Sequence, residues 1–136
     1  MGYTFQDLQV GQSASVTKTV TEDDLQKFAD VSLDTNPVHF DEEYAKTTRF
    51  GGRIAHGMLT ASLFSGLLGM RLPGPGTIYL GQTLKFKAPV SLGQTVEATV
   101  TIRELVPEKK KVTLDCVCRA GETVVVEGEA VVMFPG

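Results

Sequence analysis

The spacing of hydrophobic and polar residues changes once along the chain, from a helical period in the first half to a period of two in the second. Residues 12–20 are rich in β-branched types, which predicts a first strand. Thr21 and Asp24 then form the pattern of a helix-capping box, and apolar residues at helical spacing follow them. We therefore expect a helix that follows the strand and ends near Ser32.

The middle of the chain combines an irregular segment with an apolar helix. Residues 33–56 contain turn formers, charged residues and one short predicted helix, Asp41–Thr47, with Asp41 as its N-cap. Long irregular segments in compact domains are often functional. Residues 57–71 are apolar on all sides, so we expect a helix buried in the middle of the fold.

The second half alternates apolar and polar residues, with strands predicted within residues 78–88, 96–103, 112–118 and 124–134. Strands joined by short turns favour an antiparallel sheet with one apolar face, and the apolar helix is the natural element to cover it. The prediction is one α+β domain over residues 1–136, an antiparallel sheet wrapped around a long central helix. Because such a sheet leaves exposed edges, we also expect a homodimer.

Composition narrows the range of partners. The net charge is −3, and the single basic run, Lys109–Lys111, predicts either a solvated hairpin tip or weak attraction for a phosphate-bearing ligand, so we expect no nucleic acid partner. The apolar run Met58–Met70 has the length of a core helix, so we expect no membrane span. Without a signal peptide the expected location is cytoplasmic, with Cys116 and Cys118 reduced.

One acidic residue and one histidine lie close together in the irregular segment. Asp34 precedes His39 by five residues, and Asn36-Pro37 between them favours a turn that brings the two side chains together. A carboxylate and an imidazole that reach the same water can transfer protons in both directions. The spacing alone is equally consistent with Asp34 and Asn36 capping a turn.

The start of the apolar helix offers further candidate groups. Gly57 opens the helix, where unpaired N–H groups can stabilise an oxyanion, although a glycine there also permits a close backbone approach. Ser65 carries a hydroxyl among apolar residues and can bond within its own helix. The chain has two histidines, His39 and His56, and no metal-ligand spacing, so we expect no metal and no cofactor. A histidine near a core is often only a structural group.

Taken together, these segments resemble the MaoC-like dehydratases, and among them the bacterial (R)-specific enoyl-CoA hydratases. The resemblance covers nearly the whole chain, and it is carried by residues 34–41, 50–58, 62–68 and 79–82. It implies a hot-dog fold assembled as a dimer, which agrees with the architecture predicted from periodicity.

The resemblance also implies a reaction. Asp34 and His39 match the family's catalytic pair, which activates water for syn addition to a trans-2-enoyl-CoA and gives an (R)-3-hydroxyacyl-CoA. Gly57 matches the glycine that polarises the thioester carbonyl, and Ser65 and Asn36 are expected to position the substrate. The product is suited to polyhydroxyalkanoate synthesis. An acyl tunnel is expected along Leu63, Leu67, Leu68, Val132 and Phe134.

Two other functions remain open at this point. A hot-dog thioesterase would hydrolyse the acyl-CoA, and a binding module would hold the acyl thioester without turnover.

Overall fold

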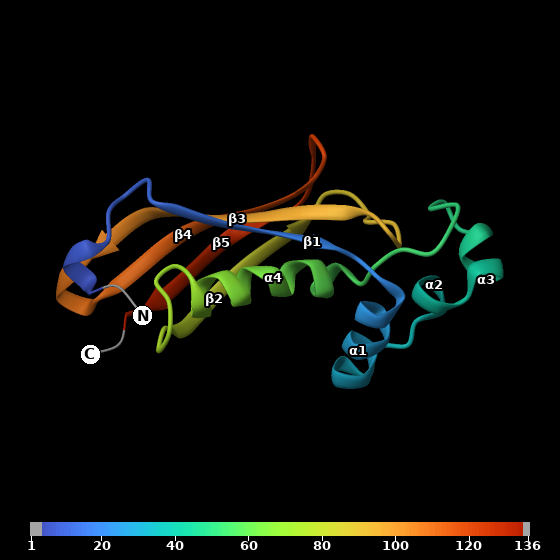
Figure 1. The fold of residues 1–136 in the computed structure, drawn as a ribbon, viewed down its shortest axis with the longest axis horizontal. Helices are drawn as coiled ribbons and strands as arrows, with labels where there is room; N and C mark the ends of the chain where they lie inside the picture. The colour runs from blue at the N-terminus through green and yellow to red at the C-terminus, as the bar shows by residue number, and fades with distance from the viewer. Residues whose placement is uncertain (1–3, 135–136) are drawn as a thin grey trace.

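The computed structural model describes residues 4–134. The helices are α1 (Glu22–Ser32), α2 (Pro37–Phe40), α3 (Glu42–Lys46) and α4 (Gly57–Met70), with short 3-10 turns at Phe5–Asp7 and Pro107–Lys109. The strands are β1 (Ser13–Thr19), β2 (Ile78–Phe86), β3 (Thr95–Val106), β4 (Lys111–Ala120) and β5 (Thr123–Met133). Figure 1 shows a sheet with the long helix α4 along one face and the shorter helices α1, α2 and α3 beyond one end.

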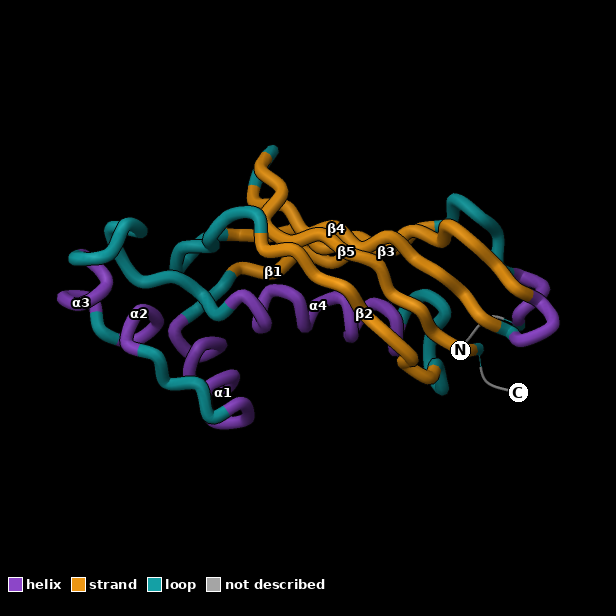
Figure 2. Tube along the Cα trace, turned by 180° about the vertical axis from the view of Figure 1, so that it is seen from behind, coloured by secondary structure: helices purple, strands orange, loops and turns teal. Residues whose placement is uncertain are grey.

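The five strands form one antiparallel sheet in the order β1-β3-β4-β5-β2. Helix α4 runs along one face of this sheet, as Figures 1 and 2 show from opposite sides. Its inward side chains are fully buried against alternate residues of the strands, and each such side chain contributes about 1.5–3 kcal/mol. The buried residues include Phe64, Leu67 and Leu68 of α4 and Val96, Val100, Ile102 and Leu114 of the sheet. The predicted fold class is confirmed.

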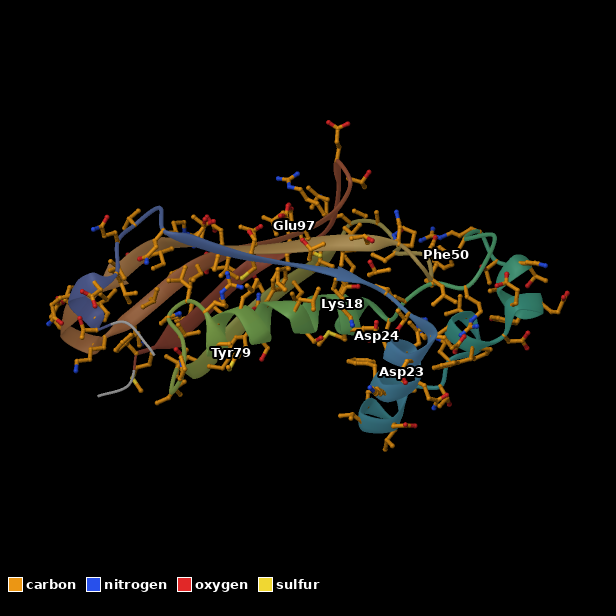
Figure 3. The ribbon with its side chains drawn as sticks, viewed as in Figure 1. Lys18, Asp23, Asp24, Phe50, Tyr79 and Glu97 are labelled. Atoms are coloured by element: carbon orange, nitrogen blue, oxygen red, sulfur yellow. The ribbon has the colours of Figure 1, made fainter. Side chains whose placement is uncertain are left out.

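Local sequence signals fix most element boundaries. The Thr21 side chain accepts the Asp24 N–H and starts α1, and Asp41 does the same for Tyr44 at the start of α3. Lys18 pairs with Asp24 at 2.9 Å, which joins β1 to α1 (Figure 3). The sequence did not predict α2. Pro37 at its first position favours a single helical turn where only a turn was expected.

One expectation about α4 is wrong for the single chain. The helix was expected to be buried on all sides, but Met58 is 55% exposed and Met70 is 70% exposed. One sheet covers only one side of a helix, so the opposite side stays uncovered. Strand β2 is also largely exposed, because it lies at the edge of the sheet. The predicted one-faced alternation holds for β3 and β4 and fails for β2.

The predictions on the two cysteines, a membrane span and the cellular location have the following outcomes. Cys116 and Cys118 are both buried and free, as expected for neighbours that point the same way from β4. Within residues 4–134, no helix has the length and apolar character needed to span a bilayer. The cytoplasmic location stays a prediction.

Candidate active site

A cavity of about 440 Å³ lies at the end of the sheet where α4 begins. Six parts of the chain supply its walls: the loop after α1, helix α2, the segment before α4, the first turn of α4, the end of β2 with the residues after it, and β5. The polar lining residues are Asp34, His39, Arg49, His56, Thr60 and Lys87, and the apolar ones include Phe50, Ile54, Met58, Phe86 and Val126. The cavity therefore joins the irregular segment to the start of the central helix, as the sequence predicted for Asp34, His39 and Gly57.

The turn between Asp34 and His39 contains the cap that the spacing suggested, and it also brings the two side chains close together. The Asp34 carboxylate accepts the Asn36 N–H at 3.1 Å, and the Asn36 side chain caps α2 by accepting the Val38 N–H at 3.2 Å. The same turn brings the carboxylate of Asp34 and ring nitrogens of His39 and His56 within 4.8 Å of one another. The turn that caps α2 thus also places the carboxylate near the imidazoles, and the catalytic role of Asp34 and His39 stays a prediction.

A backbone hydrogen bond sets the orientation of His39. Nδ1 lies 2.8 Å from the carbonyl oxygen of Ile54. A carbonyl can only accept, so Nδ1 carries the proton in the neutral ring and Nε2 keeps its lone pair. His39 is 7% exposed, whereas Asp34 is exposed. The site therefore pairs a buried neutral base with a solvated carboxylate.

The surroundings of His39 favour its neutral form. Burial is the largest influence, and it lowers the pKa of His39 below the ordinary value of 6.5. The hydrogen bond to Ile54 and the charge of Asp34 raise this pKa, and the nearby His56 lowers it. The net direction is downward. At neutral pH the imidazole is consequently available to accept a proton.

Arg53 holds the backbone of His39 from outside the cavity. Its Nε donates to the His39 carbonyl at 2.6 Å, and its two terminal nitrogens donate to the Glu22 carboxylate at 2.6 and 2.9 Å. The Arg53 hydrogen bond holds the pKa of Glu22 below its usual range. The pair could not be predicted from the sequence, because its members are far apart in the chain and belong to no motif.

The start of α4 presents backbone donors to the cavity. The first N–H groups of a helix have no intrahelical acceptor, and among the described residues no side chain caps α4; the Leu59 N–H donates to the His56 carbonyl at 3.1 Å. Gly57 lines the cavity, and a Cβ added there would lie 2.8 Å from ring atoms of Phe86. The close approach at Gly57 is therefore made by the side-chain ring of Phe86 and not by a second backbone, and the role of the Gly57 N–H toward an oxyanion stays a prediction.

The cluster of Asp34, His39 and His56 contains donor atoms of the kind that metals use. The two imidazole rings, however, are stacked with centroids 3.9 Å apart and an angle of 29° between their planes. Ring lone pairs lie in the ring plane, so two stacked rings do not converge on one ion as a tetrahedral site requires. This arrangement suits proton transfer better than metal ligation.

Several predicted residues lie away from the cavity. Ser65 is exposed on α4, and neither it nor Asn36 lines the cavity; Asn36 instead caps α2.

The predicted acyl-tunnel residues are not in the lining either, because Leu67, Leu68 and Val132 are packed in the core. Apolar lining comes instead from Phe50, Ile54, Met58, Phe86 and Val126. The end of β2 and the start of β5 are neighbours here because these two strands pair in the sheet. The local sequence pattern does not show which strands pair.

Comparison with known proteins gives a consistent result. Residues 6–129 match the family model described as a MaoC-like domain. The chain is 59% identical over 131 residues to an (R)-specific enoyl-CoA hydratase of Rhodospirillum rubrum, covering 96% of this chain and 91% of that protein. It is 47% identical over 131 residues to a 3-hydroxybutyryl-CoA dehydratase of Methylorubrum extorquens, covering 96% and 83%. A solved structure, the (R)-hydratase from A. caviae involved in PHA biosynthesis, superposes with a TM-score of 0.93 at 48% identity, covering 96% of this chain and 99% of that one.

The shifted pKa of His39 can be tested by an NMR titration, since the chain has only two histidines. We expect the His39 ring to titrate below pH 6.5, because burial disfavours its charged form. The unfolded chain then binds a proton more readily than the folded one, so stability should fall as the pH drops below 6.5. The signal is assigned by its loss in His39→Asn. A midpoint above 6.5 would contradict the account of the site.

Proposed function

The chain belongs to the MaoC-like family, and we propose that it is an (R)-specific enoyl-CoA hydratase whose reaction takes place in the cavity at the start of α4. One observation carries the proposal. A carboxylate and a neutral imidazole, on Asp34 and His39, line the same cavity as the uncapped helix start at Gly57. Hydration of an enoyl thioester needs these two functions, activation of water and stabilisation of an enolate oxygen.

The acid–base pair acts on the water. Nε2 of His39 and the Asp34 carboxylate are both acceptors, so a water between them can donate one hydrogen to each. As its oxygen bonds to C3 of the trans-2-enoyl group, one of its protons passes to the pair. Because Asp34 is anionic, it stabilises the imidazolium that forms when His39 takes that proton.

The helix start acts on the thioester. Attack at C3 moves the electron pair of the double bond toward the carbonyl oxygen, which becomes an enolate oxyanion. The Gly57 N–H, at the positive end of α4, donates to that oxygen, and a donor in this role is worth about 3–4 kcal/mol. The pair then returns a proton to C2 from the same side, which completes a syn addition. The (R)-3-hydroxyacyl-CoA so formed is a building block for polyhydroxyalkanoate, and the reverse path is dehydration.

The coenzyme portion of the substrate requires cations near the cavity. Arg49 and Lys87 both line it, Arg49 from the loop before α4 and Lys87 from the residue that follows β2. The phosphates of coenzyme A are strong acceptors for such side chains. We assign phosphate binding to Arg49 and Lys87. Lys85, on β2, does not line the cavity.

We also propose that two chains associate through β2 and the outer side of α4. Strand β2 is an edge strand that carries exposed Ile78, Tyr79 and Leu80 (Tyr79 is labelled in Figure 3), and α4 exposes Met58 and Met70. Exposed apolar residues beside an unpaired edge favour association with a second copy. A dimer would cover the side of α4 that a single sheet leaves open.

The catalytic roles can be tested with two variants that keep the local backbone bonds. Asp34→Asn retains an oxygen for the Asn36 N–H, and His39→Asn retains a donor for the Ile54 carbonyl. We expect each to lower kcat for crotonyl-CoA hydration by at least about a hundredfold without loss of stability, because each removes a proton-transfer group. Asp30→Asn, on the exposed side of α1, is the control and should leave kcat unchanged.

The same assay separates the alternative functions. A hydratase removes the conjugated enoyl absorbance without releasing thiol, a thioesterase releases thiol, and a binding module does neither. Thiol release by the parent protein, or full activity of either site variant, would overturn the assignment.

Association can be tested by sedimentation equilibrium. We expect twice the mass of one chain for the parent protein and a shift to the monomer for Leu80→Lys, because a charge on the free edge opposes strand pairing. Val31→Lys, at an exposed apolar position on α1, should leave the mass unchanged. A monomeric parent protein would rule out the dimer.

A further inference from the structure

A second histidine lies in the site, and the proposed reaction does not use it. His56 is 2% exposed and immediately precedes Gly57 as the N-cap residue of α4. Its Nε2 lies 2.9 Å from the backbone carbonyl oxygen of Asp34, and its ring stacks on that of His39. One side chain thus contacts both members of the acid–base pair and adjoins the carbonyl-binding glycine.

The contact with Asp34 fixes an otherwise weakly held stretch of chain. Asp34 follows Leu33, which ends α1 with φ 67°, in the left-handed region that L-residues with side chains avoid. Both residues are exposed, so packing does little to hold the bend. Because the Asp34 carbonyl can only accept, Nε2 of His56 carries the proton and donates to it. This hydrogen bond attaches the loop that bears the carboxylate to the start of α4.

Packing in turn fixes the ring of His56. Phe28 of α1 and Phe40 of α2 lie with ring centroids 4.8 and 5.7 Å from it, and His39 covers it at 3.9 Å. A ring held on three sides has little freedom to rotate. The ring therefore ties the positions of Asp34 and His39, the two groups proposed to activate water, to the position of α4.

A histidine at position 56 lowers the stability of the fold, and this cost supports a role beyond packing. Nδ1 of His56 is buried and has no hydrogen-bond partner within residues 4–134. Such an unpaired buried polar atom lowers stability. A phenylalanine would fill the same space without that cost, so what the histidine adds is its Nε2–H.

We propose that His56 is a positioning residue for the hydration reaction: its Nε2–H anchors Asp34, its ring sets the plane of His39, and its place before Gly57 aligns both with the carbonyl-binding N–H. The inference rests on the proposed function. Small displacements of reacting groups reduce the rate far more than they reduce binding. Loss of His56 should therefore appear in kcat more than in KM.

Three substitutions separate the hydrogen bond from the ring. His56→Phe keeps a ring and has no donor, His56→Gln places an amide N–H near the Nε2 position, and His56→Asn carries the same amide but does not reach that position. We expect His56→Phe and His56→Asn to lower kcat for crotonyl-CoA by about 10- to 100-fold, with KM changed less than about threefold. His56→Gln should recover kcat to within about tenfold of the parent, since its amide replaces the lost donor. Should His56→Phe fail to fold, the comparison of Gln with Asn decides the question.

Stability measurements complete the test. If the Nε2–H matters for positioning rather than folding, His56→Phe should be at least as stable as the parent while being much less active. The inference is overturned if all three variants stay within about twofold of the parent kcat, or if His56→Gln is as slow as His56→Asn. Absence of hydration by the parent protein would instead overturn the proposed function, so the two failures are distinguishable.

Discussion

The hydrogen bond from Nδ1 of His39 to the carbonyl of Ile54, 2.8 Å long, is the interaction on which the proposed active site depends. It places the ring proton on the nitrogen that faces the backbone and leaves Nε2 free to accept a proton. It also connects α2 to the segment that leads into α4, so the proposed base His39 and the helix start at Gly57 are joined through one hydrogen bond. Without this bond the imidazole could adopt either tautomer and either ring orientation, and the water would have no fixed acceptor beside Asp34.

The two groups proposed to activate water, His39 and Asp34, lie in different environments. His39 is buried, and its pKa is lowered mainly by that burial, whereas Asp34 is exposed and lies on a bend held by hydrogen bonds. A buried imidazole that stays neutral and a carboxylate that faces solvent can share one water without competing for one proton. Arg53 and His56 contact backbone carbonyls of His39 and Asp34, so they support the pair while leaving its reactive atoms free.

Much of this arrangement could be predicted from sequence, because it depends on local signals. The cap at Thr21, the turn at Asn36-Pro37 and the period-two strands each leave a recognisable pattern, and the structure has an element at each of them. The exposed side of α4 was missed because hydropathy does not say how many surfaces surround a helix. The Arg53–Glu22 pair and the cavity walls from β2 and β5 were missed because they join segments that only the folded sheet and helices bring together.

The central claim concerns which nitrogen of each histidine carries the proton, and nitrogen-15 NMR of the neutral rings tests it most directly. With the chain's two histidines assigned from single variants, the account predicts opposite tautomers for the two neutral rings. His39 should carry its proton on Nδ1, because the Ile54 carbonyl accepts from it, and His56 should carry its proton on Nε2, because the Asp34 carbonyl accepts from that atom. A proton on Nε2 of His39 would leave the water without its imidazole acceptor and would contradict the account.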